Sequence, residues 1–167
     1  FKLDQLTVAN GIEHESAHDA LGDVIATIEM AKLVKARQPK LYDYVFQLKD
    51  KSKVQAEIDL VTQKPMLHVS MRYPASRGCL ALVMPICIHP GNKNSVVIYD
   101  LREDPHAWQD LSIDEMKERI QTPKEKLPQG VNRIPLKTLR VNSCPIVTSP
   151  AVLKKEQAEK FQVLAYL

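Results

Sequence analysis

The apolar residues of this chain change their spacing near Asp59, and this change constrains the fold more than any other feature of the sequence. Before it, apolar positions recur three and four residues apart, which is the spacing of a helix with one apolar face. After it, short runs rich in Val, Ile and Leu are separated by proline or glycine clusters, as is typical of strands. The sequence therefore predicts an α+β protein, helical first and sheet-forming afterwards.

The helical part contains one long predicted helix. The apolar stripe from Leu21 to Ile28 predicts a helix over 17–35 with one buried face. Pro39 ends this helix, because proline lacks a backbone donor. Shorter helical segments are predicted over 41–48 and 54–58.

A capping pattern precedes the long helix. Ser16 and Asp19 have the spacing of an N-cap and its third helical residue, so His18 is expected in the first turn and Asp23 one turn later. A histidine and an aspartate at this spacing are a weak motif by themselves. Acidic residues also favour helix starts for electrostatic reasons, and a first-turn histidine is often ordinary polar surface.

The second part predicts a small sheet. Five short strands with a helical insertion fit a highly curved sheet or a barrel. The insertion begins at Ser112 and Glu115, which form a capping box, and it ends at Pro123. The proline and glycine cluster at 89–94 predicts a hairpin turn. The predicted strands cover 66–71, 80–88, 96–101, 134–141 and 145–148, and a further helix is predicted over 154–164.

Composition argues against a disulfide-stabilised protein, a zinc site formed by cysteines and a membrane-spanning helix. The formal net charge of +3 is small, but residues 31–53 form a basic flank that suits a polyanionic ligand as well as it suits a solvated surface. The three cysteines show no disulfide or zinc-site spacing, which fits a reducing compartment, so we expect a cytoplasmic protein. The longest apolar run, 79–88, is about half of the roughly 20 residues that a membrane helix needs.

The segment around His18 and Asp23 resembles the third sequence motif of the bacterial exodeoxyribonuclease I family. These enzymes are 3′→5′ exonucleases of the DEDD type with a histidine general base. The matching residues there are Leu6-Thr7, Ala9-Asn10-Gly11-Ile12, His14, Ala17-His18-Asp19-Ala20 and Asp23-Val24. Further matches follow in order at Lys32-Leu33-Val34-Lys35, Arg37-Gln38-Pro39, Asp43-Tyr44, Lys64-Pro65, His68-Val69-Ser70, Arg77-Gly78, His89-Pro90, Asp100-Leu101, Asn142 and Cys144-Pro145.

The resemblance covers roughly residues 1–150 and implies a division of the chain. Residues 1–37 would be the C-terminal remnant of an RNase H-like exonuclease domain, 38–153 an SH3-like barrel domain with helical insertions, and 154–167 the start of a C-terminal helical domain. The family's first motif, Asp-x-Glu, does not occur in the chain, and the chain does not begin with Met. We therefore expect an internal fragment of a longer, monomeric protein.

The resemblance also implies chemistry. The parent would release nucleotides from the 3′ end of single-stranded DNA during DNA repair and recombination, using two Mg²⁺ ions. Asp23 would be the last of four metal-binding carboxylates, and His18 would accept a proton from the attacking water. One carboxylate cannot hold a two-ion site, so the fragment alone is expected to be inactive.

Two binding roles are predicted for the fragment. Arg72, Tyr73 and Arg77, with Trp108, are candidates for single-stranded DNA contacts, whereas the alternative places both aromatic rings in the core or at its rim. By resemblance, Tyr44 and Lys64 would dock the acidic C-terminal tail of the single-stranded DNA-binding protein, although each also fits a plain structural role.

The sequence leaves two other functions open. One is a non-catalytic SH3-like interaction module in which His18 and Asp23 are incidental. The other is a related nuclease that acts on RNA; only the resemblance disfavours it, because no residue pattern here reads a 2′-hydroxyl.

Overall fold

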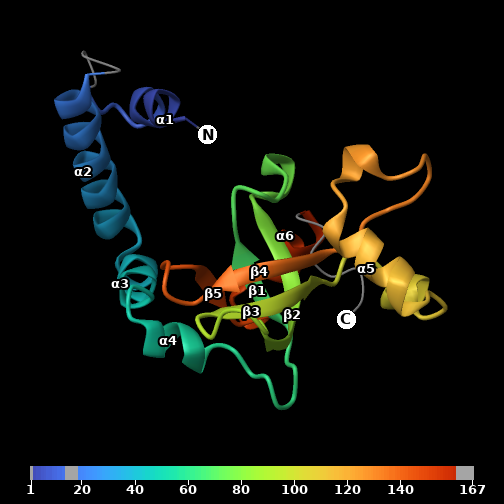
Figure 1. Ribbon diagram of the computed structural model, residues 1–167. Helices are drawn as coiled ribbons and strands as arrows, with labels where there is room; N and C mark the ends of the chain where they lie inside the picture. Colours follow the sequence, from blue (N-terminus) through green and yellow to red (C-terminus); the bar gives the residue numbers. More distant parts are fainter. Residues whose placement is uncertain (1, 14–18, 161–167) are drawn as a thin grey trace. The chain divides into compact units, whose positions relative to one another are not determined.

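The computed structural model describes residues 2–13 and 19–160, and the chain forms two compact units that meet between Gln47 and Leu48. The first unit contains the helices α1 (Leu3–Ala9), α2 (Ala20–Arg37) and α3 (Pro39–Gln47). The second contains α4 (Lys51–Ala56), β1 (Met66–Val69), β2 (Leu80–Ile88), β3 (Ser95–Asp100), α5 (Ile113–Gln121), β4 (Leu136–Arg140), β5 (Ile146–Thr148) and α6 (Lys155–Lys160), with short 3₁₀ turns at Ala75–Arg77, Pro105–Trp108, Lys124–Lys126 and Pro150–Val152 (Figure 1).

The long helix of the first unit begins later than the sequence predicts. Asp19, rather than Ser16, is the N-cap of α2, because its carboxylate accepts a hydrogen bond of 3.3 Å from the backbone N–H of Gly22. The helix therefore starts at Ala20, and the expected first-turn position of His18 lies outside the described residues. Helix α3 packs against α2, and the first compact unit extends to Gln47, whereas the resemblance puts the family's domain boundary after residue 37.

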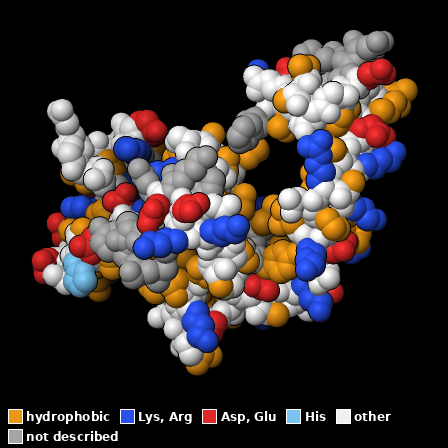
Figure 2. Space-filling model, turned by 180° about the vertical axis from the view of Figure 1, so that it is seen from behind, with side chains coloured by type: hydrophobic (Ala, Val, Ile, Leu, Met, Phe, Trp, Pro, Cys, Tyr) orange, Lys and Arg blue, Asp and Glu red, His pale blue; other side chains and the backbone are white. Residues whose placement is uncertain are grey.

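The apolar stripe of α2 is not buried, contrary to the prediction. Leu21, Val24, Ile25 and Ile28 are about half to two-thirds exposed, with relative exposures of 66%, 56%, 50% and 48%. Figure 2 shows apolar side chains at the surface of this helical unit, beside Lys and Arg side chains. The stripe has helical spacing, but α1 and α3 contact α2 without covering it.

The second unit is built on an antiparallel sheet with the strand order β4-β3-β2-β1-β5. All five strands lie within about two residues of their predicted positions, and the 89–94 turn closes the β2–β3 hairpin through a hydrogen bond from His89 N–H to the Ser95 carbonyl. The register of β2 against β3 shifts between Pro85 and Cys87, which marks a bulge. A bulge increases local twist, so it bends this central hairpin.

The sheet is strongly curved. Two strands separate β1 from β4, so these strands would lie about 14 Å apart in a flat sheet. The ring nitrogen Nε2 of His68 on β1 nevertheless lies 3.0 Å from Nζ of Lys137 on β4. The structure thus has the mixed helical and antiparallel-sheet fold that the sequence predicts. Its sheet is curved strongly enough that side chains of β1 and β4 are in contact.

Two apolar clusters hold this unit together. Leu67 and Leu82 are each 1% exposed and pack between β1 and β2. Tyr99, Trp108 and Ile134 form the second cluster, against which α5 packs through Met116. The predicted capping box at the start of α5 is confirmed, since Ser112 and Glu115 each bond the other's backbone N–H.

None of the helices in the described part of the chain is long and apolar enough to span a membrane.

Candidate nucleic-acid interface

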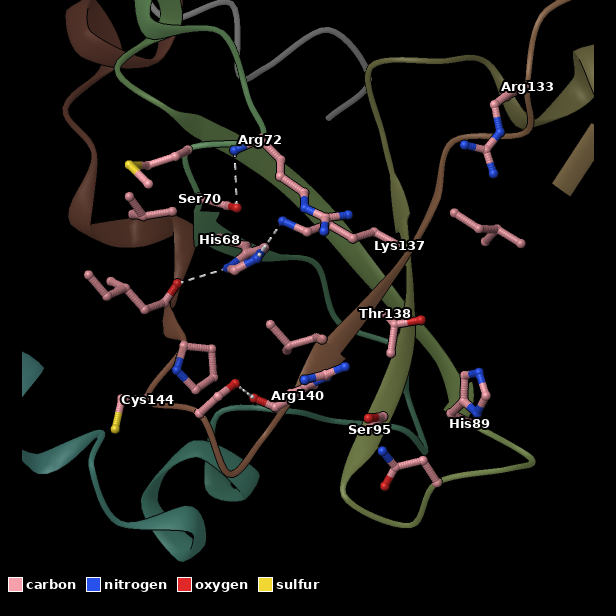
Figure 3. A pocket seen from close by; sticks show the side chains of 18 residues that line it. His68, Ser70, Arg72, His89, Ser95, Arg133, Lys137, Thr138, Arg140 and Cys144 are labelled. Atoms are coloured by element: carbon pink, nitrogen blue, oxygen red, sulfur yellow. Dashed lines mark hydrogen bonds between the residues drawn. The ribbon is translucent and has the colours of Figure 1, made fainter. Parts of the chain in front are cut away.

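A groove of about 1000 Å³ runs between β1, β4 and the turns beside them in the second unit (Figure 3). Its cationic lining residues come from three separate segments, and no described lining residue is an aspartate, a glutamate, a tryptophan, a tyrosine or a phenylalanine. The groove therefore offers positive charge and hydrogen-bond donors without an aromatic platform. The cations are Arg72, Arg133, Lys137 and Arg140.

A chain of hydrogen bonds crosses the floor of the groove. Nδ1 of His68 lies 3.1 Å from the carbonyl oxygen of Ile146 on β5, and Nε2 lies 3.0 Å from Nζ of Lys137 on β4. Figure 3 shows both interactions, with the imidazole between the two strands. His68 is 4% exposed, whereas Lys137 is partly exposed and reaches the groove.

Burial governs the protonation of this pair. Desolvation lowers the pKa of His68 to about 4, and the nearby ammonium of Lys137 adds to the effect. Desolvation also lowers the pKa of Lys137 to about 8, together with the positive charge of Arg72. At neutral pH the imidazole is therefore neutral, and the lysine is charged but close to its titration range.

The groove's arginines are more accessible than its lysine. Arg72, Arg133 and Arg140 are all exposed, and Nη2 of Arg133 donates to the carbonyl oxygen of Ile120. Arg72 follows β1 and Arg140 ends β4, so the charges lie at separate points along the groove (Figure 3). Spaced guanidinium groups of this kind suit successive phosphates of a polynucleotide.

Tyr73 is not a lining residue of the groove, and its burial agrees with the alternative that placed it in the core or at its rim. It is 8% exposed, and Lys137 Nζ lies 4.4 Å from its ring centroid while the Arg102 guanidinium lies 5.9 Å away. His68 packs edge-on against the same ring at 5.7 Å. A covered ring cannot stack on a base, so Tyr73 is a wall behind Lys137 rather than a stacking platform.

The other predicted contacts divide between the groove and the core. Arg72 lines the groove, whereas Arg77 lies half-buried in a 3₁₀ turn and is not among its lining residues. Trp108 is buried and donates from Nε1 to Tyr99 Oη at 2.8 Å, which confirms the alternative that placed it in the core.

Sequence reasoning missed Lys137 and Arg140. The signal was present, because Lys137 and Arg140 are two cations within the predicted strand 134–141, whose other residues except Thr138 are apolar. Their importance depends on the curvature of the sheet, which brings β4 over β1.

Tyr44 is half-buried on α3 in the first unit and Lys64 is exposed before β1 in the second.

The described residues do not form a metal centre on their own. Across 2–13 and 19–160, no three His, Cys, Asp or Glu side chains are grouped closely enough to hold an ion. Asp23 lies half-buried in the first turn of α2 and His18 lies outside the described residues. Mg²⁺ requires several oxygen ligands in octahedral geometry, so Asp23 fits as one ligand and not as a site.

A small, curled antiparallel sheet with helical insertions and a side groove is the arrangement of an SH3-like domain. The model of the exonuclease I SH3-like domain family matches residues 49–165, so the chain belongs to the exonuclease I SH3-like domain family. The match begins at the second residue of the second unit.

Relatives and solved structures agree with this assignment. Exodeoxyribonuclease I of Escherichia coli K12 is 43% identical over 98% of the chain, and that of Haemophilus influenzae is 40% identical over 98%. The crystal structure of E. coli exonuclease I with a dA16 oligonucleotide matches 99% of the chain at 42% identity, with a TM-score of 0.91. The solved structure of a moderately thermophilic exonuclease I from Methylocaldum szegediense matches 98% of the chain at 45% identity, with a TM-score of 0.92.

The chain spans about a third of the length of these proteins. It covers 34% and 35% of the two relatives and 35% and 34% of the two structures.

Proposed function

We propose that this chain is part of a single-strand-specific 3′→5′ exodeoxyribonuclease and that its basic groove holds single-stranded DNA. The observation that carries the proposal is the groove itself, which has four cations and no described carboxylate on its lining. A polyanion that enters it meets no acidic group and releases condensed counterions. The relatives named exodeoxyribonuclease I, and the E. coli structure solved with an oligonucleotide, support the same assignment.

The lining also indicates how DNA is held. Aromatic stacking is worth about 1–3 kcal/mol per base in single-strand binders, and no Trp, Tyr or Phe is among the described lining residues. The groove therefore recognises the sugar-phosphate backbone. Its preference for one base over another is expected to be small.

The test is a titration of a fluorescent oligo-dT with the chain at several salt concentrations. Three or four phosphate contacts predict a slope of about −2 to −3 for the logarithm of the association constant against that of salt. An oligonucleotide of equal length with abasic residues is expected to bind within about threefold of oligo-dT, because stacking contributes little. Binding that is absent or independent of salt would contradict the groove assignment.

The nuclease chemistry of the longer protein is part of the same proposal. Helix α2 would be the C-terminal helix of an RNase H-like nuclease domain, with Asp23 as one carboxylate ligand of Mg²⁺ and His18 as general base. The remaining ligands would come from other parts of the protein. This activity would serve DNA repair, and the chain alone would bind oligonucleotides without hydrolysing them.

A second function is protein docking by an SH3-like module, with or without catalysis. The partner we propose is the acidic C-terminal tail of the single-stranded DNA-binding protein, and the candidate contacts are Tyr44 and Lys64. The exposed ammonium of Lys64 supports this proposal, because it can meet an acidic peptide without rearrangement.

The change from Lys64 to alanine tests that second role. Lys64→Ala is expected to weaken binding of the tail peptide about threefold to tenfold, because one exposed charge pair is lost. Calorimetric titration of the peptide into both variants would measure it. Lys53→Ala, which removes a lysine from α4 instead, is the matched control and should leave the affinity unchanged. Equal affinity of Lys64→Ala and wild type would remove Lys64 from the site.

A further inference from the structure

We infer that His68 is a positioning residue, which holds the ammonium of Lys137 at the floor of the groove as a phosphate-binding group. The inference deepens the function proposed above and rests on it. It assigns a role to a histidine that is 4% exposed and whose Nε2 is occupied by Lys137, so that its effect on a ligand would pass through that lysine.

The tautomer of His68 follows from its two neighbours. The Ile146 carbonyl can only accept a hydrogen bond, so Nδ1 of His68 carries the hydrogen and donates it. Nε2 then has only a lone pair and accepts from the ammonium of Lys137. The neutral imidazole therefore accepts a hydrogen bond from the Lys137 ammonium through Nε2. A protonated imidazole would instead direct an N–H group at that ammonium, which repels it.

The same imidazole joins the two edges of the sheet. Strands β4 and β5 are the outer strands in the order β4-β3-β2-β1-β5, and His68 contacts one residue on each of them. These two contacts, both drawn in Figure 3, fix the width of the groove at the height of Lys137. A lysine held in this way loses less side-chain entropy when a phosphate binds than a free one does.

The groups around Lys137 leave its charge open to a ligand. The ring of Tyr73 lies 4.4 Å from its Nζ, and Arg72 faces it as a like charge. Asp100 at the end of β3 attracts it, but Nε of Arg102 donates to both carboxylate oxygens of Asp100 at 3.0 Å. A phosphate in the groove would therefore be the principal counter-ion of Lys137.

This environment gives DNA binding a defined pH dependence. The lysine is protonated below a pKa of about 8 in the free protein, and a bound phosphate raises that pKa. Its contribution to affinity is therefore complete below about pH 8 and declines as the pH rises above it. Wild type is expected to lose about fivefold to tenfold in oligo-dT affinity between pH 7.5 and 9.5 through this group. Lys137→Arg should lose much less, since arginine stays charged. This variant leaves every other lining residue of the groove unchanged.

A double-mutant cycle separates positioning from a general structural role. His68→Leu is expected to weaken oligo-dT binding about fivefold at pH 7 and to have no further effect in Lys137→Met, since both remove the same contact. His68→Gln keeps an acceptor and a donor, so it should restore most of the affinity. Combination of His68→Leu with Arg140→Ala is the control and should be additive, because His68 has no hydrogen bond to Arg140. Fluorescence of Trp108, the single tryptophan, reports that each variant is folded.

A measurement without DNA completes the test. In ¹⁵N NMR spectra of the free chain, His68 should carry its hydrogen on Nδ1, and Lys137→Met should shift its Nε2 resonance. A hydrogen on Nε2, an unshifted resonance, or additive effects of His68→Leu and Lys137→Met would overturn the inference. If His68→Leu does not fold, the NMR result and His68→Gln decide. Loss of all oligonucleotide binding with the expected NMR result would instead reject the proposed function.

Discussion

Replacement of Leu82 by alanine is expected to lower the free energy of unfolding of the second unit by about 3 kcal/mol. Leu82 is 1% exposed on the central strand β2, where it pairs with Leu67 of β1 and lies in the same apolar cluster. The truncation removes buried apolar surface and leaves a cavity that the paired strands cannot close by moving. Urea unfolding followed by Trp108 fluorescence measures the change, because this buried residue belongs to the same unit.

A matched control lies at the other end of the same strand. Ile88 is 56% exposed, so Ile88→Ala removes similar atoms from a site where water already reaches the side chain. Its effect is expected to be below about 1 kcal/mol. Similar losses for the two variants would mean that the β1–β2 cluster is not the core of this unit.

Removal of three cations from the groove is expected to have the largest effect on DNA binding. The triple variant Arg72→Ala, Lys137→Ala, Arg140→Ala should bind oligo-dT about 100-fold more weakly at low salt, and its salt slope should be shallower by about 2, since three phosphate contacts are lost. Fluorescence anisotropy at several salt concentrations measures both quantities. The slope counts contacts, whereas the affinity alone does not.

Net charge needs its own control. Lys124, Lys126 and Lys155 lie in the same unit but outside the lining of the groove, and their replacement by alanine changes the net charge equally. This second triple variant is expected to stay within about threefold of wild type, with nearly the same salt slope. An equal loss in both triple variants would show that DNA responds to overall charge and not to the groove.

Local signals in the sequence predicted most elements of the fold. The bounds of β2 at Leu80 and Ile88 and the capping box at Ser112 depend on residues close together in the chain, so their pattern is readable without the tertiary structure. The start of α2 was misplaced for a similar local reason. The spacing of Ser16 and Asp19 indicated an N-cap and its third helical residue, whereas the bond from the Gly22 N–H to the Asp19 carboxylate makes Asp19 itself the N-cap.

The groove could not be predicted in this way. Its central pair, His68 and Lys137, is separated by 69 residues and meets only because the sheet curls. For Tyr73 the sequence left two roles open, base stacking or a place in the core, and only the folded structure, in which the ring is 8% exposed, decides for the second. The exposed stripe of α2 has the spacing of a buried face, and spacing alone does not reveal what covers it.

The register shift between Pro85 and Cys87 has an evolutionary consequence. Side chains alternate between the two sides of a strand, so loss or gain of one residue reverses the side on which every residue up to the next turn lies. Pro85 pairs with Ile98 and Ile88 pairs with Val96, so both face the same side of the sheet although three residues separate them, and the extra residue of the bulge is what allows this. Descendants of this sequence should therefore vary in length at the 89–94 hairpin tip, while this interior position inherits a fixed number of residues.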